Sequence, residues 1–134
     1  GIPVLAHIGF TPQMIHSLGG FKVQGRSKEQ QEYLLSRAKE LEAIGCFGVL
    51  LEMLPSDLSK SITESLSVPT IGIGAGPDCD GQVLVTEDVV GLSGFEPKFV
   101  KKYASLRDDM KSAITDFKSD VTTRSFPKIK QTFQ

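Results

Sequence analysis

The amino-acid sequence predicts an α/β protein built from parallel strand–helix units, and three observations lead to this prediction. Short apolar runs of strand length alternate with longer segments whose apolar residues recur at helical spacing. The connections between these segments are only about two to six residues long. The order through residue 73 is strand, helix, strand, helix, strand, which favours parallel strands joined by right-handed crossovers.

The first unit begins with an apolar run over residues 3–8 that is typical of a buried strand. Thr11 and Pro12 then have the chemistry of an N-cap and a first helical turn. A short helix is therefore predicted through about residue 17, and the glycines at 19 and 20 end it.

A longer helix is predicted over residues 28–44. Ser27 and Gln30 have the spacing of a capping box, and Gly45 stands where a left-handed C-cap is expected. The apolar stripe that would face the sheet consists of Tyr33, Leu34, Ala38, Leu41 and Ile44.

Two more strands and a helix complete the predicted alternation. A strand over residues 47–52 follows the long helix directly, and a strand over 68–73 follows the next one. Between them, Ser56 or Asp57 is expected to cap a helix, whose apolar face carries Leu58, Ile62 and Leu66.

The rest of the chain is less regular. Residues 77–81 are rich in turn formers, and one of the apolar pieces 82–85 and 89–92 is expected to supply a fourth strand. From residue 97 the pattern becomes that of polar amphipathic helices, with Ser105 as the expected cap of a helix that reaches Val121. We interpret 1–96 as strand–helix units and 97–134 as terminal helices and tail of the same domain.

Composition is that of a soluble globular protein. The 134 residues are 40% hydrophobic and 23% charged with a net charge of -1, which argues against nucleic-acid and membrane-surface partners. No apolar run approaches the roughly 20 residues that span a bilayer, so we expect a cytoplasmic protein. Cys46 and Cys79 have no metal-site or CxxC spacing, so we expect reduced cysteines. Because Gly1 leads almost directly into a strand, we expect a chain that begins partway through a longer protein.

Functional-looking groups follow three of the predicted strands. Glu52 ends the run 47–51, His7 ends the run 4–6, and a glycine loop over 72–76 follows the third strand. Parallel units place their active sites at the carboxyl ends of the strands. A partly buried glutamate there has a raised pKa and suits a general base, whereas a strand-end histidine is equally often a satisfied core residue.

The glycine loop and the nearby acidic residues have two interpretations each. The loop Gly72-x-Gly74-x-Gly76 could bind an anion through its backbone amides, or it could only permit a tight turn. Asp78 and Asp80 could bind a divalent cation, although turn formation is the more common role of aspartate beside glycine and proline.

Longer strings of the sequence resemble the ketopantoate hydroxymethyltransferase family. The matching strings, in order and at matching spacing, are 6–13, 19–26, 51–52, 69–76 and 80–85. Where that family often has Glu-Cys-Val-Pro, this chain has Glu-Met-Leu-Pro from Glu52 to Pro55. The resemblance implies the carboxyl-terminal half of a (β/α)8 barrel, with about four parallel units and terminal helices.

The resemblance also implies a reaction. The family transfers a hydroxymethyl group from 5,10-methylenetetrahydrofolate to the keto acid 3-methyl-2-oxobutanoate, giving 2-dehydropantoate for pantothenate synthesis. Glu52 matches the family's proton-abstracting base, and His7 matches a histidine at the keto acid site. Mg²⁺ is implied with ligands in the missing amino-terminal half, so no metal ligand is assigned in this chain.

Three expectations about assembly and function follow from the same resemblance. We expect the chain to be inactive without the amino-terminal half and to form a homo-oligomer. As an alternative, the half-barrel is a non-catalytic assembly module that uses the helix over 105–121. As a weaker alternative, it belongs to another keto-acid lyase or mutase of the phosphoenolpyruvate-type barrels.

Overall fold

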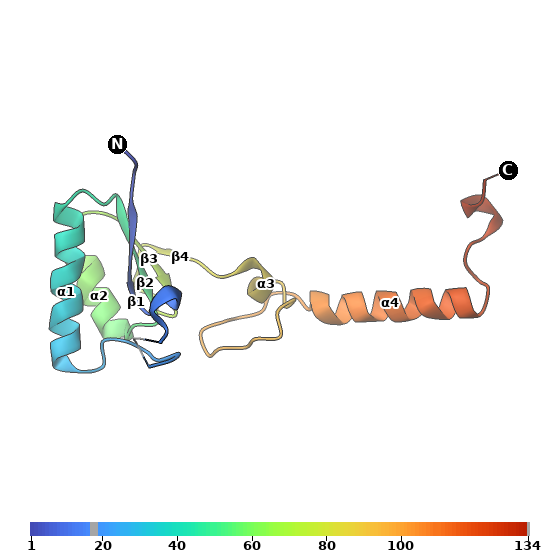
Figure 1. Ribbon diagram of the computed structural model, residues 1–134, viewed down its shortest axis with the longest axis horizontal. Helices are drawn as coiled ribbons and strands as arrows, with labels where there is room; N and C mark the ends of the chain where they lie inside the picture. Colours follow the sequence, from blue (N-terminus) through green and yellow to red (C-terminus); the bar gives the residue numbers. More distant parts are fainter. Residues whose placement is uncertain (17–18, 134) are drawn as a thin grey trace. The chain divides into compact units, whose positions relative to one another are not determined.

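The computed structural model describes residues 1–16 and 19–133. It divides into two compact units, Gly1–Leu84 and Val85–Gln134 (Figure 1). The sequence-based division at residues 96 and 97, and the assignment of both parts to one domain, stay predictions.

The first unit is built on a sheet of four parallel strands in the order β1-β2-β3-β4, which confirms the predicted fold class. The strands are β1 (Leu5–Gly9), β2 (Gly48–Glu52), β3 (Thr70–Ile73) and β4 (Gly81–Gln82). The fourth strand is only two residues long and begins one residue before the predicted piece 82–85.

Two helices, α1 (Lys28–Ala43) and α2 (Ser56–Ser65), lie against the same face of this sheet (Figure 1). The Ser27 hydroxyl accepts a hydrogen bond from the Gln30 amide at 3.2 Å, as the capping box predicts. The Gln30 side chain instead accepts from the amides of Gly25 and Arg26, so it anchors the preceding loop. Gly45 has a φ of 94°, which confirms the left-handed turn after the helix.

The expected cap of α2 was wrong. The N-cap is Pro55, and neither Ser56 nor Asp57 caps the helix, because both already lie in its first turn. The Pro55 carbonyl begins the helical ladder by accepting from the amide of Ser59 at 3.0 Å and from its hydroxyl at 3.1 Å. The proline ring fixes φ at -58°, which sets the direction in which the chain enters the helix.

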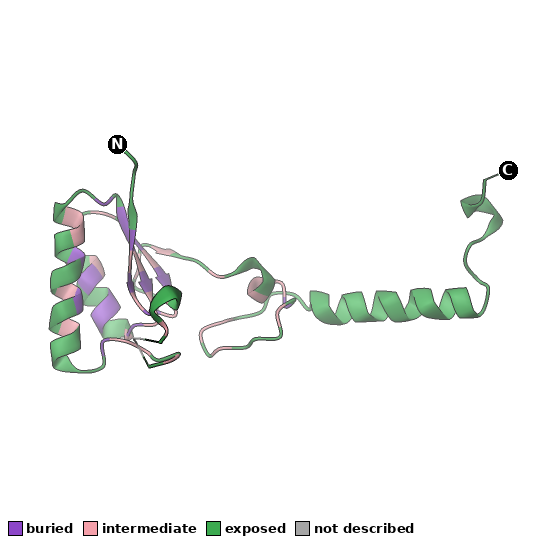
Figure 2. Cartoon of the chain, in the orientation of Figure 1, coloured by how far each residue is buried: buried purple, intermediate pink, exposed green. Residues whose placement is uncertain are grey.

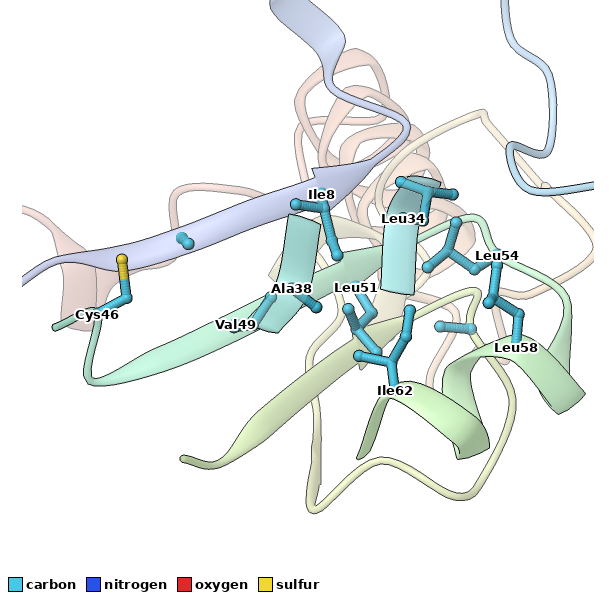
Figure 3. Close-up of a cluster of buried hydrophobic side chains, with 11 residues drawn as sticks. Ile8, Leu34, Ala38, Cys46, Val49, Leu51, Leu54, Leu58 and Ile62 are labelled. Carbon is cyan, nitrogen blue, oxygen red and sulfur yellow. The ribbon is translucent and has the colours of Figure 1, made fainter. Parts of the chain in front are cut away.

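The core lies between the sheet and these two helices (Figure 3). Alternate strand residues point into it, as the twofold periodicity of a strand requires. Its main members are Ala6, Ile8, Leu34, Ala38, Cys46, Val49, Leu51, Leu54, Leu58, Ile62 and Ala75. Tyr33 and Ile44 of the predicted helical stripe are exposed, so the buried stripe is narrower than the sequence suggested.

The short helix after β1 is also smaller than predicted. It is a 3-10 turn, η1 (Pro12–Met14), and residue 17 of the predicted helix lies outside the described residues. Its hydrogen bonds run from Met14 to Thr11 and from Ile15 to Pro12, one residue closer than in an α-helix.

The second unit holds α3 (Thr86–Val89), α4 (Leu106–Thr122) and a final 3-10 turn, η2 (Ile129–Gln131). The helical pattern expected from residue 97 does not form before α4, and Ser105 precedes α4 without a side-chain capping bond. No residue of α4 is buried (Figure 2). Within the described residues, no helix is both long and apolar enough to cross a membrane.

Truncating the core should cost far more stability than truncating the surface. Ile62 is 0% exposed and Ile44 is 76% exposed, so Ile62→Ala should lower the free energy of unfolding by about 2–5 kcal/mol and Ile44→Ala by less than about 0.5 kcal/mol. Urea unfolding of both variants measures the difference. Equal losses would contradict the assignment of the core.

Candidate functional site

The register of β1 and β2 brings His7 and Glu52 together. His7 is paired with Leu50, and Gly9 is paired with Glu52, so the two side chains project from the same face of the sheet on neighbouring strands. Core residues such as Leu51 project from the opposite face, toward the helices. The Nε2 atom of His7 lies 3.0 Å from Oε2 of Glu52.

Gly9 makes this arrangement possible at the end of β1. Its φ is +95°, and a Cβ atom there would lie 2.2 Å from the Glu52 carbonyl oxygen. The next amide, that of Phe10, donates to the same carbonyl at 2.9 Å. The end of β1 is therefore fixed against the backbone of the candidate base.

Burial dominates the electrostatics of the pair. The side chain of Glu52 is 15% exposed and that of His7 is 29% exposed. Desolvation by burial raises the pKa of Glu52, and the nearby His7 lowers it only in part. A carboxyl group with a raised pKa is a stronger base once ionised, which is the property expected of a catalytic proton acceptor.

His7 retains hydrogen-bonding capacity. Although its Nε2 atom is close to Glu52, the ring is not aligned for a hydrogen bond, and this buried atom has no hydrogen-bond partner among the described residues. Buried polar atoms are rarely left in this state. The arrangement can therefore remove a proton with Glu52 while His7 binds a ligand oxygen or shares the proton.

The glycine loop after β3 packs against the start of α2. Gly74 and Gly76 have φ values of 62° and 81°, and a Cβ atom on Gly76 would lie 2.2 Å from Oγ of Ser56. The Gln82 side chain donates to the Gly76 carbonyl at 2.9 Å. These contacts explain the glycines without a ligand, because the loop needs a tight turn and close backbone packing.

Asp80 ties the same loop back to β3. Its carboxylate accepts from the Thr70 amide at 2.8 Å and from the Thr70 hydroxyl at 3.0 Å, and these bonds lower its pKa. The structure thus assigns Asp80 the turn-forming role that the sequence left open. Among residues 1–16 and 19–133, no group of three His, Cys, Asp or Glu side chains is arranged to hold a metal ion.

Sequence reasoning missed the residues that enclose the backbone of Glu52. Phe10 is fully buried and stacks on Phe21 with ring centroids 5.0 Å apart. The Gln24 amide donates to the carbonyl of Met53 at 3.0 Å, and Met53 has a φ of 51°. The family-matching strings 6–13, 19–26 and 51–52 lie around these residues, but nothing in the sequence indicated a methionine with a left-handed backbone.

A cavity of about 420 Å³ lies beside β1 and the first half of α1. His7, Gln24, Gly25, Tyr33 and Arg37 are among its lining residues, but Glu52 is not. The cavity therefore borders the His7–Glu52 pair on the side of His7.

Fold and site together define a class: α/β proteins of parallel strand–helix units with their functional groups at the carboxyl ends of the strands. The sequence profile of one family in particular, ketopantoate hydroxymethyltransferase, matches residues 1–129. The chain belongs to this family, which confirms the resemblance found in the sequence.

Curated relatives agree with the family assignment. The protein named 3-methyl-2-oxobutanoate hydroxymethyltransferase in Legionella pneumophila (strain Paris) is 54% identical to this chain, and the match covers 99% of the chain and 51% of the relative. The protein of that name in Thermosipho melanesiensis is 51% identical, and the match covers 100% of the chain and 51% of the relative. The protein of that name in Cyanothece sp. (strain PCC 7425) is 53% identical, and the match covers 95% of the chain and 49% of the relative. The chain thus spans about half the length of these relatives, which is consistent with half of a (β/α)8 barrel.

Removing the Glu52 charge should stabilise the chain near neutral pH. Because burial raises its pKa, the folded state keeps this proton to a higher pH than the unfolded state, so ionisation costs stability as the pH rises between the two values. Glu52→Gln cannot ionise, so its gain in stability over the parent chain should grow as the pH rises from the ordinary glutamate pKa to the raised one. The gain should vanish below the ordinary pKa of 4.5.

Thermal unfolding midpoints between pH 4 and pH 8 measure this effect. Glu64→Gln, which changes an exposed glutamate on α2, is the matched control. An advantage of Glu52→Gln that shrinks as the pH rises would show that attraction to His7 outweighs desolvation, contrary to our interpretation.

Proposed function

We propose that this chain supplies the catalytic base of a 3-methyl-2-oxobutanoate hydroxymethyltransferase. The reaction transfers a hydroxymethyl group from 5,10-methylenetetrahydrofolate to 3-methyl-2-oxobutanoate and gives 2-dehydropantoate. The observation that carries the proposal is the contact of Glu52 with His7 at the ends of two parallel strands, with the pKa of Glu52 raised by burial. Family membership supports the choice of reaction.

Each of the two side chains has one role in this proposal. The carboxylate of Glu52 takes the proton from the branched carbon of the keto acid, and the resulting carbon nucleophile attacks the one-carbon unit, with water supplying the hydroxyl oxygen and tetrahydrofolate leaving. The Nε2 atom of His7, which lacks a hydrogen-bond partner among the described residues, donates to an oxygen of the keto acid and orients it.

We propose that Mg²⁺ and its ligands belong to the other half of the protein. Within the described residues of this chain, no cluster of acidic, histidine or cysteine side chains fits a metal ion. No step is therefore assigned to a metal here, and Glu52 and His7 act on the substrate directly.

We also propose that a polypeptide equivalent to the amino-terminal half of the relatives completes the site. In the described sheet β1 pairs only with β2, and its other edge is free to accept a strand. The free edge and the half-length match to the relatives both support this partner. The cytoplasmic location stays a prediction.

Glu52 should be required for turnover in the completed protein. The chain is co-produced with the amino-terminal half of the Legionella pneumophila relative, and formation of 2-dehydropantoate is measured with saturating substrates and Mg²⁺. Glu52→Gln should lower kcat by about 10²–10⁴-fold because it removes the proton acceptor. Glu40→Gln should retain activity, since Glu40 is exposed on α1, which covers the face of the sheet opposite Glu52.

Two results would contradict the proposal. Full activity of Glu52→Gln in the completed protein would exclude Glu52 as the base. Robust turnover by the chain alone would show that the site needs no second half.

A second candidate function is assembly through α4. Its apolar residues recur at spacings of three and four and are all exposed, and they are Leu106, Met110, Ile114, Phe117 and Val121. One flank of this stripe is basic, with Arg107, Lys111 and Lys118, and the other is acidic, with Asp109, Asp116 and Asp120. In a parallel pair of identical helices about a twofold axis, each basic flank faces an acidic one.

Self-association should therefore depend on this stripe. At high concentration the chain should form a dimer of twice 14.6 kDa by light scattering, and Ile114→Asp should abolish it. Ser112→Asp, on the opposite side of α4, should leave the dimer intact. A chain that stays monomeric at all concentrations, and pairs only with the amino-terminal half, would exclude this candidate.

A further inference from the structure

Met53 has a backbone conformation that its side chain disfavours. Its φ is 51°, in the left-handed region where residues other than glycine are uncommon. It directly follows Glu52, the candidate base, and comes two residues before Pro55, the N-cap of α2. A strained backbone that persists beside a functional group is a reason to look for a role.

This conformation reverses the alternation of β2. In a continued strand, residue 54 would lie on the same face as Glu52, because side chains alternate between faces. Instead Leu54 is 3% exposed and belongs to the core, as does Leu51. The turn at Met53 therefore lets Glu52 stay on the site face while Leu54 returns at once to the opposite side.

Hydrogen bonds from three segments hold this turn. The Glu52 carbonyl accepts from the Phe10 amide at 2.9 Å, and the Met53 amide donates to the Ile73 carbonyl at 2.9 Å. The Met53 carbonyl accepts from the Gln24 amide at 3.0 Å. The ends of β1 and β3 and the loop before α1 are thus fixed to the two residues that set the position of the base.

The loop that Gln24 anchors is itself tightly packed. A Cβ atom on Gly25 would lie 2.4 Å from the Leu58 side chain and 3.1 Å from that of Leu34, and Gly25 has a φ of +76°. The Gln31 side chain donates to the Gly25 carbonyl at 3.1 Å. A shift at Met53 would therefore be transmitted to a loop that has little room to adjust.

We propose that Met53 is a positioning residue whose left-handed backbone, rather than its side chain, aims Glu52 at the substrate and anchors the loop at Gln24. This inference rests on the proposed role of Glu52 as the base.

Three substitutions at this position separate backbone from side chain. Met53→Gly removes the side chain but adopts a positive φ without strain, and Met53→Leu keeps a side chain of similar size that is not branched at Cβ. Met53→Ile adds a β-branch, which disfavours this region strongly. Ser112→Thr, at an exposed position of α4 outside the apolar stripe, is the control for adding a β-branch elsewhere.

The first measurement is kinetic, in the protein completed with the amino-terminal half. Met53→Ile should lower kcat by about 10–100-fold with a smaller change in KM, since displacing a catalytic group by about 1 Å has effects of this size. Met53→Gly, Met53→Leu and Ser112→Thr should stay within about threefold of the parent. If Met53→Gly is as impaired as Met53→Ile, or if Met53→Ile is normal, the inference is wrong.

The second measurement needs no turnover. In the 134-residue chain, NMR of ¹³C-labelled glutamate carboxyl groups gives the titration midpoint of Glu52. Met53→Ile should move this midpoint and Met53→Gly should leave it in place, whereas an unmoved midpoint in Met53→Ile contradicts the inference. A completed parent protein that makes no product would refute the proposed function, and the carboxyl titration would still decide the role of Met53.

Discussion

The site depends on the register of β1 and β2. Pairing Gly9 with Glu52 places His7 on the same face of the sheet, two residues further back on the neighbouring strand. A slip of one residue would move His7 to the helix-covered face, because side chains alternate between the two faces of a strand. The core residues of β1 resist such a slip, since Ala6 and Ile8 would leave the core with it. Packing against α1 and α2 thus fixes the geometry of the pair.

Desolvation gives this pair its chemical character at a cost in stability. Burial raises the pKa of Glu52, and the opposing influence of His7 is smaller. A structural ion pair would show the reverse balance, with the partner holding the carboxyl pKa below its ordinary value. Perturbation by burial plus one specific partner is typical of functional sites. The Nε2 atom of His7 contacts Glu52 but makes no hydrogen bond within the described residues, and a ligand oxygen would satisfy it.

Much of this architecture was predictable because it follows from the local spacing of apolar residues. The alternation of elements, α1, and the placement of Glu52 at a strand end follow from apolar spacing and from capping residues such as Ser27. The polar link from Asp80 to Thr70 was not predictable, because it joins residues ten apart through a turn. The left-handed φ of Met53 had no local signal either, since tertiary hydrogen bonds impose it. The helix expected from residue 97 does not form, because its apolar stripe of Phe99, Val100 and Tyr103 is too short to predict a helix.

The central claim is that Glu52 removes a proton from the branched carbon of the keto acid. Its most direct test is exchange of that proton with deuterium from D₂O, followed by NMR of 3-methyl-2-oxobutanoate, in the protein completed with the amino-terminal half and without folate. We expect the protein to exchange this proton, Glu52→Gln to abolish the exchange, and Glu40→Gln to leave it unchanged. Equal exchange rates in the parent protein and Glu52→Gln would contradict it.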